Sequence, residues 1–356
     1  MVDLNFLEAY AYDLPERLIA QQPVEPRDSC RLLVVDRAKR SFEHRIFTDL
    51  PDYLDSRDLA VANNTKVIPA RLLGYRLREE RGREVHGGRV EFVLLEEREP
   101  LVWEGLFHAS AKYVPGVKFE VPTPDGGNLR GELVIGSKDM PQGTVVARFD
   151  RDPVESGAGQ LPLPHYIHRP VKAGDDADYQ TVYASNPGSA AAPTAGLHFT
   201  ERVLSRLRQK GVEWEELTLN VGLGTFRPVK TEDVSQHSMH EERYSISSEA
   251  ARRITEAKHA GRRILAIGTT SVRALESAWD GASLKSGPGK TSIFIRPGGS
   301  QVRLVDRLLT NFHLPRSTLL MLVCAFADHE LIMAAYHEAL REQYRFFSYG
   351  DAMLII

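Results

Sequence analysis

Short alternating apolar and polar runs dominate the chain between residues 70 and 150. Examples are ARLLGYRL, RVEFVLLE, LVWEGLFH and TVVARFD, and turn pairs such as Gly87-Gly88 and Pro115-Gly116 separate such runs. Alternation with period two is typical of half-buried strands, and no stretch of this window shows the 3.6-residue period of a helix. Several short strands joined by glycine and proline turns predict a small antiparallel β-barrel.

Strands and helices alternate on both sides of this window. Strands are predicted at 31–37, 58–63, 213–221 and 262–268. One helix is predicted to start near Glu201 with Thr200 as its N-cap, and another to follow the N-cap Ser247. Further helices are predicted in SVRALESAWDG, STLLMLVCAF and LIMAAYHEALREQ, and short ones at 15–20 and 51–54. Residues 281–300 are predicted to form a loop with an exposed tip at 286–289.

The fold class that follows is α/β, with a large mixed α/β domain interrupted by a small antiparallel β-barrel domain. Residues 1–68 and 156–356 would form the discontinuous catalytic domain, and 69–155 the inserted barrel. A length of 356 residues is in keeping with two domains.

The composition excludes several classes of protein. With 42% hydrophobic and 26% charged residues, the chain is neither a disordered tail nor a fibre. Cys30 and Cys324 lie far apart and form no CxxC, which argues against a zinc site built on paired cysteines and for a reducing compartment. The apolar run at 319–327 is too short to span a bilayer, and the acidic N-terminus does not resemble a signal peptide. We therefore expect a cytoplasmic protein without a membrane partner.

The 45 basic and 48 acidic residues give a net charge of −3, so bulk charge does not predict polyanion binding. One stretch, 252–273, is locally basic. It is interpreted either as a solvated helix face or as a face that contacts RNA phosphates. Its charged residues are Arg252, Arg253, Lys258, Arg262, Arg263 and Arg273, against the single acid Glu256.

Three hydroxyl side chains, Thr269, Thr270 and Ser271, follow Gly268 between an apolar strand and a helix. Free backbone N–H groups at a helix N-terminus suit an anion, a carboxylate or a polar nucleoside edge. Ordinary helix capping is the alternative interpretation. Arg273 and Glu276 follow in the first turns of that helix and would face the same cleft.

Two glycine-containing loops are further candidates. The segment 222–226, GLGTF, has GxG without the third glycine of a dinucleotide-binding motif, so a tight turn explains it equally well. The segment 191–200, AAPTAGLHFT, is rich in small residues that let a ligand approach the backbone. His198, a polar residue among apolar ones, is interpreted either as a hydrogen-bonded structural residue or as a catalyst.

Two histidine segments and the C-terminus complete the candidates. His237 and His240 form HxxH followed by acids, but the HExxH pattern is absent, so a proton-handling pair or a polar loop is favoured over a metal site. Residues 310–315, TNFHLP, contain a further His. Aromatics beside Arg and Asp351 at 345–351 suit a nucleobase or cation site, or else form a strand that closes the core.

Eight motifs in order along the chain carry a resemblance to one family. They are ANNTKVIPARL (62–72), LPLPHYIHRP (161–170), YQTVYA (179–184), AAPTAGLHFT (191–200), VGLGTF (221–226), GTTSVRALES (268–277), TNFHLPRSTLLMLV (310–323) and YRFFSYGDAM (344–353). Together they resemble the S-adenosylmethionine:tRNA ribosyltransferase-isomerases of queuosine biosynthesis. This chain departs from the family pattern at two positions. It has Asn220 where the family has His, and Gln236 where the family has an acidic residue.

The resemblance implies a tRNA-modifying transferase and isomerase. The ribosyl part of S-adenosylmethionine passes to 7-aminomethyl-7-deazaguanine at the tRNA wobble position and becomes an epoxycyclopentane ring, giving epoxyqueuosine, adenine and methionine. S-adenosylmethionine is then a consumed substrate, and no cofactor and no metal are expected. The other partner is a tRNA anticodon loop, and a monomer is expected. The family fold, an α/β domain interrupted by a small β-barrel, agrees with the pattern.

This chemistry needs groups that move protons and groups that hold two substrates. The expected proton-transfer residues are His198, His237, His240 and His313. Ribose hydroxyls, adenine or the methionine carboxylate would contact Thr194, Thr269, Thr270, Ser271 and Asn311. The sulfonium would face Glu276 or Asp351, and Arg273 would hold the methionine carboxylate or a tRNA phosphate.

Two other functions compete with this one. The chain could be an RNA-binding module without catalysis, although so many polar residues beside glycine turns argue against binding alone. It could also be a metal-dependent hydrolase using His237 and His240. A chelator titration separates them, because only the hydrolase would lose activity with EDTA and regain it with zinc.

Overall fold

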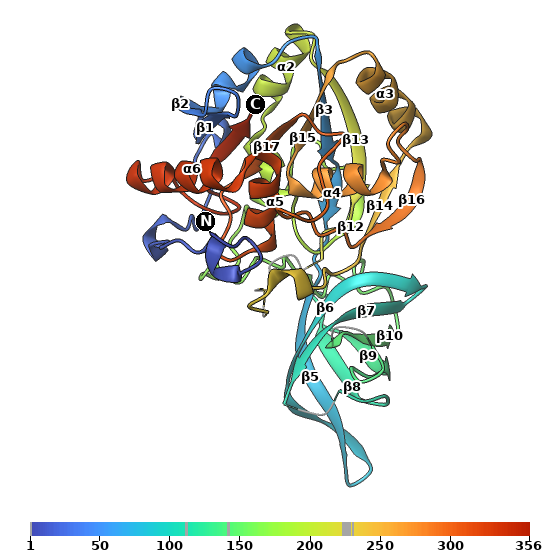
Figure 1. The fold of residues 1–356 in the computed structure, drawn as a ribbon. Coiled ribbons are helices and arrows are strands. Elements are labelled where there is room, and N and C mark those ends of the chain that lie inside the picture. Colours follow the sequence, from blue (N-terminus) through green and yellow to red (C-terminus); the bar gives the residue numbers. More distant parts are fainter. Residues whose placement is uncertain (1, 111–112, 141–142, 223–228, 230) are drawn as a thin grey trace.

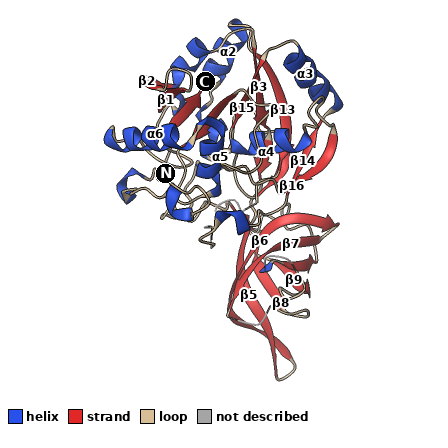
Figure 2. Ribbon diagram, in the orientation of Figure 1, coloured by secondary structure: helices blue, strands red, loops and turns tan. Residues whose placement is uncertain are grey.

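The computed structural model describes residues 2–110, 113–140, 143–222, 229 and 231–356. These residues form two sheet units, a larger one with helices on both faces and a smaller one made of strands, from which a long hairpin projects (Figures 1 and 2).

The larger unit is built on a nine-stranded mixed sheet. Strands β13, β3, β15 and β17 run parallel in its centre, β18 is antiparallel to β17 and parallel to β1, and the remaining pairs are antiparallel. The order is β16 (Gly287–Thr291), β14 (Glu242–Ile246), β13 (Glu213–Leu219), β3 (Asp58–Asn63), β15 (Arg263–Ile267), β17 (Arg307–Asn311), β18 (Ala352–Ile355), β1 (Arg31–Asp36) and β2 (Ser41–Ile46).

Side chains of the central strands alternate between two apolar cores, one on each face of this sheet. In β3, Leu59 and Val61 join the first core, whereas Ala60 and Ala62 join the second. Helices α3 (Ser248–His259), α4 (Thr269–Ala278), α5 (Thr318–Ala327) and α6 (His329–Arg341) pack into the first core. Helix α2 (Glu201–Gln209) and the 3-10 helix η4 (Phe47–Tyr53) pack into the second. Burial on both faces explains why these strands are continuously apolar.

The smaller unit is an antiparallel sheet with its own apolar core of phenylalanine rings. Gly105 and Gly131 are needed there, because a Cβ on either would lie 2.4 Å from the ring of Phe92 or Phe119. The strand order is β11 (Gly159–Gln160), β5 (Arg71–Glu80), β6 (Arg83–Glu99), β7 (Val102–Ala109), β10 (Val145–Phe149), β9 (Asn128–Ile135) and β8 (Lys118–Pro122). Strand β8 also pairs with β5, at the positions Tyr75–Glu120 and Arg76–Phe119.

Short elements connect the two units and surround the large sheet. Strands β4 and β12 pair in parallel beside the end of β3. Their bounds, with those of the short helices, are β4 (Thr65–Val67), β12 (Asn186–Ser189), α1 (Asp175–Asp178), η1 (Leu7–Tyr10), η2 (Glu16–Leu18), η3 (Arg27–Ser29), η6 (Thr194–His198) and η8 (Val234–Gln236).

Several sequence predictions are confirmed at the level of single residues. Strand β3 has the predicted bounds, and both predicted N-caps are present: Thr200 accepts from the Val203 N–H and Ser247 from the Ala250 N–H. Helix α4 begins two residues earlier than SVRALES suggested, since Gly268 adopts φ +88° directly before Thr269.

The predicted loop at 281–300 is wrong over part of its length. Residues 287–291 form β16, which pairs with β14 at one edge of the sheet. An edge strand tolerates Pro288, whose missing N–H costs no ladder bond. Gly289 lies under the ring of Tyr244, where a Cβ would come within 2.4 Å. The glycines and proline that indicated a turn instead permit close pairing.

Among the described residues, no single helix is both long and apolar enough to cross a bilayer; α5 and α6 reach the required length only as a pair bent by 117°.

Candidate active-site cavity

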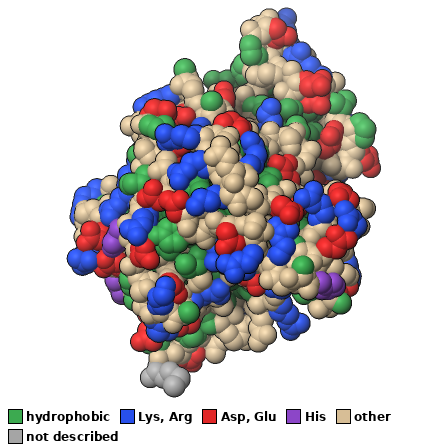
Figure 3. Space-filling model, turned by 90° about the horizontal axis from the view of Figure 1, so that it is seen from above, with side chains coloured by type: hydrophobic (Ala, Val, Ile, Leu, Met, Phe, Trp, Pro, Cys, Tyr) green, Lys and Arg blue, Asp and Glu red, His purple; other side chains and the backbone are tan. Residues whose placement is uncertain are grey.

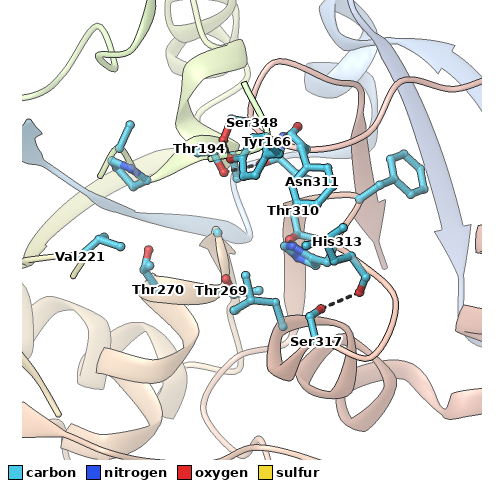
Figure 4. Close-up of a pocket in the computed structure, with 18 of the residues that line it drawn as sticks. Tyr166, Thr194, Val221, Thr269, Thr270, Thr310, Asn311, His313, Ser317 and Ser348 are labelled. Carbon is cyan, nitrogen blue, oxygen red and sulfur yellow. Dashed lines mark hydrogen bonds between the residues drawn. The ribbon is translucent and has the colours of Figure 1, made fainter. Parts of the chain in front are cut away.

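A cavity of about 320 Å³ lies at the carboxyl ends of β15 and β17. Open α/β sheets commonly bind ligands at this edge of parallel strands. Figure 4 shows Thr194, Tyr166 and Ser348 grouped beside Asn311, Thr310 and His313, with Thr269 and Thr270 across from them. The cavity therefore gathers polar groups from five segments that are distant in the sequence.

The N-terminus of α4 forms one wall of the cavity. Gly268 turns the chain from β15 into α4, and no side chain of the described residues caps the first N–H groups of the helix. The Thr270 hydroxyl is buried and has no hydrogen-bond partner among the described residues. An uncapped helix N-terminus beside an unpaired hydroxyl suits a polar or anionic ligand group. Thr269 and Thr270 both line the cavity at this helix N-terminus, and their contact with a substrate stays a prediction.

Asn311 is the central polar residue of the opposite wall. Its Oδ1 accepts from the Thr194 hydroxyl at 2.9 Å, and its Nδ2 donates to His198 Nε2 at 2.9 Å and to the Phe347 carbonyl at 3.2 Å. Asn311 ends β17 and is 2% exposed. The structure thus brings together three residues that the sequence predicted to act in one site, namely Thr194, His198 and Asn311.

His198 lies behind Asn311 rather than in the cavity wall. Its Nδ1 is 3.3 Å from Cys30 Sγ, and its ring packs against that of Phe47. Burial, assisted by the positive charges of Arg345 and Arg27, lowers the pKa of His198 to about 3. This histidine is therefore neutral at physiological pH, with Nε2 as the acceptor that faces Asn311.

His313 does line the cavity and is also neutral. Burial lowers its pKa to about 3, and its Nε2 lies 2.9 Å from the Thr310 hydroxyl. Its backbone N–H donates to the Tyr336 hydroxyl at 2.9 Å, which holds the loop after β17 in place. A neutral imidazole can accept a proton or form a hydrogen bond, but it carries no positive charge with which to bind an anion.

Sequence reasoning missed several residues of this wall. His165 is exposed at the cavity, and the ring of Tyr166 packs at a tilt against that of Phe347, with centroids 4.2 Å apart. Tyr166 also hydrogen-bonds to Ser348. The signal was present in the sequence, since LPLPHYIHRP and YRFFSYGDAM were both among the shared motifs.

Two cavity residues adopt backbone conformations that side chains other than glycine rarely take. Phe347 has φ +72° and Arg316 has φ +56°. Such conformations persist only where surrounding contacts fix them, and they concentrate at functional sites.

Three other residues that were predicted to contact the substrates are hydrogen-bonded to protein groups instead, and none of them lines the cavity. They are Ser271, Glu276 and Asp351. The Ser271 hydroxyl donates to the Ile267 carbonyl at 2.8 Å. Glu276 accepts the N–H groups of residues 303–305 at 2.9 to 3.0 Å, and Asp351 accepts those of Arg31 and Arg345. Burial raises the pKa of both carboxyl groups. Each holds backbone N–H groups where a role toward the sulfonium had been expected.

Arg273 is buried against Glu242 of β14 in an ion pair, away from the residues that line the cavity. This guanidinium was expected to hold the methionine carboxylate or a tRNA phosphate, and in the structure it pairs with a carboxylate of the protein instead. Its Nε and Nη2 atoms are buried without a partner among the described residues.

The HxxH segment does not form a helix face. The 3-10 helix η8 ends at Gln236, so His237 and His240 follow it outside any helix or strand. His237 packs edge-on against Phe294, and partial burial lowers its pKa. Neither lines the cavity, and no group of three or more potential metal ligands occurs among the residues that the structure describes.

The two positions that depart from the family pattern have local partners. Asn220 accepts from the Thr65 hydroxyl at 3.0 Å, and Gln236 Nε2 is 3.3 Å from Asp233. The predicted GLGTF loop lies mostly outside the described residues, because only Gly222 of that segment belongs to them.

The basic stretch at 252–273 is not a free basic face. On the face shown in Figure 3, basic and acidic side chains are interleaved. Each base of the stretch has a carboxylate partner: Arg252 with Glu249 and Glu256, Arg253 with Glu213 and Glu215, Lys258 with Asp306, Arg262 with Glu213, Arg263 with Asp55 and Asp58, and Arg273 with Glu242. These partners neutralise the charge that was expected to meet RNA phosphates.

A family model, two relatives and one solved structure that are similar to this chain carry related names. A family model described as "Queuosine biosynthesis protein" matches residues 7–355. A relative from Symbiobacterium thermophilum is 50% identical over 98% of this chain and 99% of its own length, and one from Clostridioides difficile is 45% identical over 97% and 98%. Both are named S-adenosylmethionine:tRNA ribosyltransferase-isomerase. The crystal structure of the S-adenosylmethionine tRNA ribosyltransferase from Thermotoga maritima is 36% identical, covers 98% of this chain and 100% of its own, and superimposes with a TM-score of 0.55.

Proposed function

The chain belongs to the queuosine biosynthesis protein family of S-adenosylmethionine:tRNA ribosyltransferase-isomerases, and on that premise we propose the following reaction. The enzyme transfers the ribosyl group of S-adenosylmethionine to 7-aminomethyl-7-deazaguanine at the wobble position of tRNA. The ribosyl group isomerises to an epoxycyclopentane ring, which gives epoxyqueuosine and releases adenine and methionine.

This reaction requires the removal of protons from two places. The acceptor is an alkylamine that is mostly protonated at neutral pH, and the carbon beside the sulfonium must lose a proton before rearrangement. Adenine must receive a proton or a hydrogen bond as it leaves. One well-placed acid–base group supplies about 10²–10⁴-fold in rate, so the positioning of both substrates must supply much of the remainder.

The observation that carries the proposal is the cavity in which the uncapped N-terminus of α4 faces the Asn311 wall. Thr194, Thr269, Thr270 and Asn311 are proposed to hold polar groups of the two substrates. His313, in the wall, remains a proposed proton-transfer residue. His165 joins it as a further candidate, because it is exposed at the cavity.

We also propose that residues 69–155 form an inserted β-barrel domain between the two parts of the catalytic domain. The pairing of β8 with β5, in addition to the antiparallel order from β5 to β8, supports closure of the barrel. The separate core of this unit, which includes Phe92, Phe107 and Phe119, supports its independence. An anticodon-loop substrate, a monomer, a cytoplasmic location and no bound cofactor complete the proposal.

The tip of the β5–β6 hairpin is proposed to contact tRNA phosphates. Arg81 and Arg83 are exposed there and have no ion-pair partner among the described residues. Replacing both with glutamine is expected to weaken tRNA binding and to lower the slope of log affinity against log salt by about 1 to 2. Filter binding between 50 and 200 mM salt measures both quantities.

The matched control for this prediction is Arg252→Gln, which removes an exposed arginine already paired with Glu249 and Glu256. It is expected to leave the salt slope unchanged. If Arg252→Gln lowers the salt slope more than the hairpin variant does, the tRNA phosphates contact the 252–273 stretch rather than the hairpin.

The proposed reaction is tested with S-adenosylmethionine and tRNA carrying the aminomethyl-deazaguanine base. Mass analysis of the digested nucleosides is expected to show epoxyqueuosine, with free adenine and methionine in equal amounts. tRNA binding without any product would instead indicate an RNA-binding module. Loss of product with EDTA and recovery with zinc would indicate metal-dependent chemistry.

A further inference from the structure

A chain of four buried or half-buried side chains connects the cavity to the second core of the large sheet. Cys30 Sγ lies 3.3 Å from His198 Nδ1, His198 Nε2 lies 2.9 Å from Asn311 Nδ2, and Asn311 Oδ1 lies 2.9 Å from Thr194 Oγ1. Cys30, His198 and Asn311 are at most 3% exposed, whereas Thr194 is half-buried and lines the cavity. Asn311 and Thr194 both line the cavity and can meet a ligand, and Thr194 is the more exposed of the two, whereas Cys30 and His198 lie behind them.

The donor and acceptor at each step follow from one fixed group. The Phe347 carbonyl can only accept, so the Asn311 atom beside it at 3.2 Å must be the amide nitrogen. The second hydrogen of that nitrogen points to His198, whose Nε2 must then be the unprotonated, accepting atom. The opposite atom of the amide is the oxygen, and the Thr194 hydroxyl must donate its hydrogen to it.

This order leaves Thr194 with only lone pairs to present to the cavity. A hydroxyl has one hydrogen and two acceptor positions, and the hydrogen is already used. Thr194 thus suits a hydrogen-bond donor on the ligand, such as an amino group or a sugar hydroxyl, and disfavours a bare carbonyl or carboxylate oxygen.

We propose that His198 is a positioning residue which, through Asn311, fixes the Thr194 hydroxyl as an acceptor for a donor group of the bound substrate. The proposal rests on the function proposed above and replaces a proton-transfer role for His198. His198 stands one residue behind the cavity wall, and both of its ring nitrogens already face protein atoms, so it has no free position for a proton from the substrate.

A pair of substitutions at His198 separates positioning from proton transfer. Glutamine can place its Oε1 near the position of Nε2 and accept from Asn311, but it cannot act as a base. His198→Gln is therefore expected to keep kcat/KM within tenfold of the wild type with an unchanged pH–rate profile. His198→Leu, which leaves a buried Asn311 N–H unpaired, is expected to lower kcat/KM by about tenfold or more.

A double-mutant cycle tests the route through Thr194. Thr194→Val keeps the side-chain shape and is expected to lower kcat/KM by about tenfold, whereas the matched control Thr194→Ser keeps the hydroxyl. If His198 acts through Thr194, the double variant His198→Leu/Thr194→Val is expected to have a kcat/KM no more than about twofold below that of the less active single variant. Thermal unfolding of each variant confirms that the fold is intact.

Three results would overturn the positioning role. They are additive losses in the cycle, a loss of tenfold or more in folded His198→Gln, and a limb of the pH–rate profile that disappears in that variant. If His198→Leu does not fold, His198→Gln and its pH profile decide alone. A wild-type protein that makes no modified nucleoside refutes the proposed function itself, whereas an active wild type with these results overturns only the role of His198.

Discussion

Replacing Asn311 with leucine is expected to lower kcat/KM for tRNA modification by about a hundredfold or more. The leucine keeps the approximate volume but removes an amide that holds Thr194, His198 and the Phe347 carbonyl at once. Removing one preorganised polar group from an active site commonly costs about 10²–10³ in rate, and here the loss also releases its neighbours. Initial rates at several tRNA concentrations, with S-adenosylmethionine saturating, measure the change.

The matched control is Asn186→Leu, the same exchange at an exposed amide of β12 that lies outside the cavity. The side-chain amide of Asn186 donates hydrogen bonds to the side chains of Asn64 and Thr218 instead. This control is expected to stay within about twofold of the wild type. An Asn311→Leu enzyme that folds and keeps more than a tenth of its activity would show that Asn311 is not central to the site.

The secondary structure could be predicted wherever local chemistry decides it. Strand β3 has six buried residues in succession, and the hydroxyls of Thr200 and Ser247 cap their helices because only local geometry is needed. Strand β16 could not be predicted in this way, because its glycine and proline are explained only by pairing with β14, more than forty residues earlier in the chain.

The site could be predicted in its residue types but not in which side chain faces the cavity. Thr270 and Ser271 are neighbours on α4, yet one lines the cavity and the other bonds back to Ile267. Successive helix residues differ by about 100° in direction, so membership of a motif does not determine exposure to a ligand. Glu276 shows the same difficulty, since its partners at 303–305 come from a distant loop.

Cavity residues that meet only through tertiary folding could not be predicted from the sequence. Tyr166 and Ser348 meet only because 161–170 and 344–353 fold against each other. Conversely, the spacing of His237 and His240 suggested a shared helix face, but both residues lie outside any helix. Prediction from sequence therefore identified the segments of the site more reliably than the role of each side chain.

Two buried histidines, which must stay neutral in the folded protein, are expected to lower the free energy of unfolding by about 4 kcal/mol between pH 7 and pH 5. Burial lowers the pKa of His198 and of His313 to about 3, against about 6.5 in the unfolded chain. The unfolded chain therefore binds more protons below pH 6.5. The stability that each neutral histidine contributes is fully present above pH 6.5 and is lost as the pH falls toward 3.

The buried carboxyl groups of Glu276 and Asp351 act in the opposite direction. Their pKa values are raised by burial, so they stabilise the fold at pH values below those of the unfolded carboxyl groups and lose that effect as the pH rises through the folded values. Urea unfolding at pH 7, 6 and 5 measures the sum. His198→Gln is expected to remove about half of the decrease, and the control His168→Gln, an exposed histidine, to leave it unchanged. A decrease that is the same in His198→Gln as in the wild type would mean that His198 contributes nothing to it, and the neutral state assigned to His198 would fail.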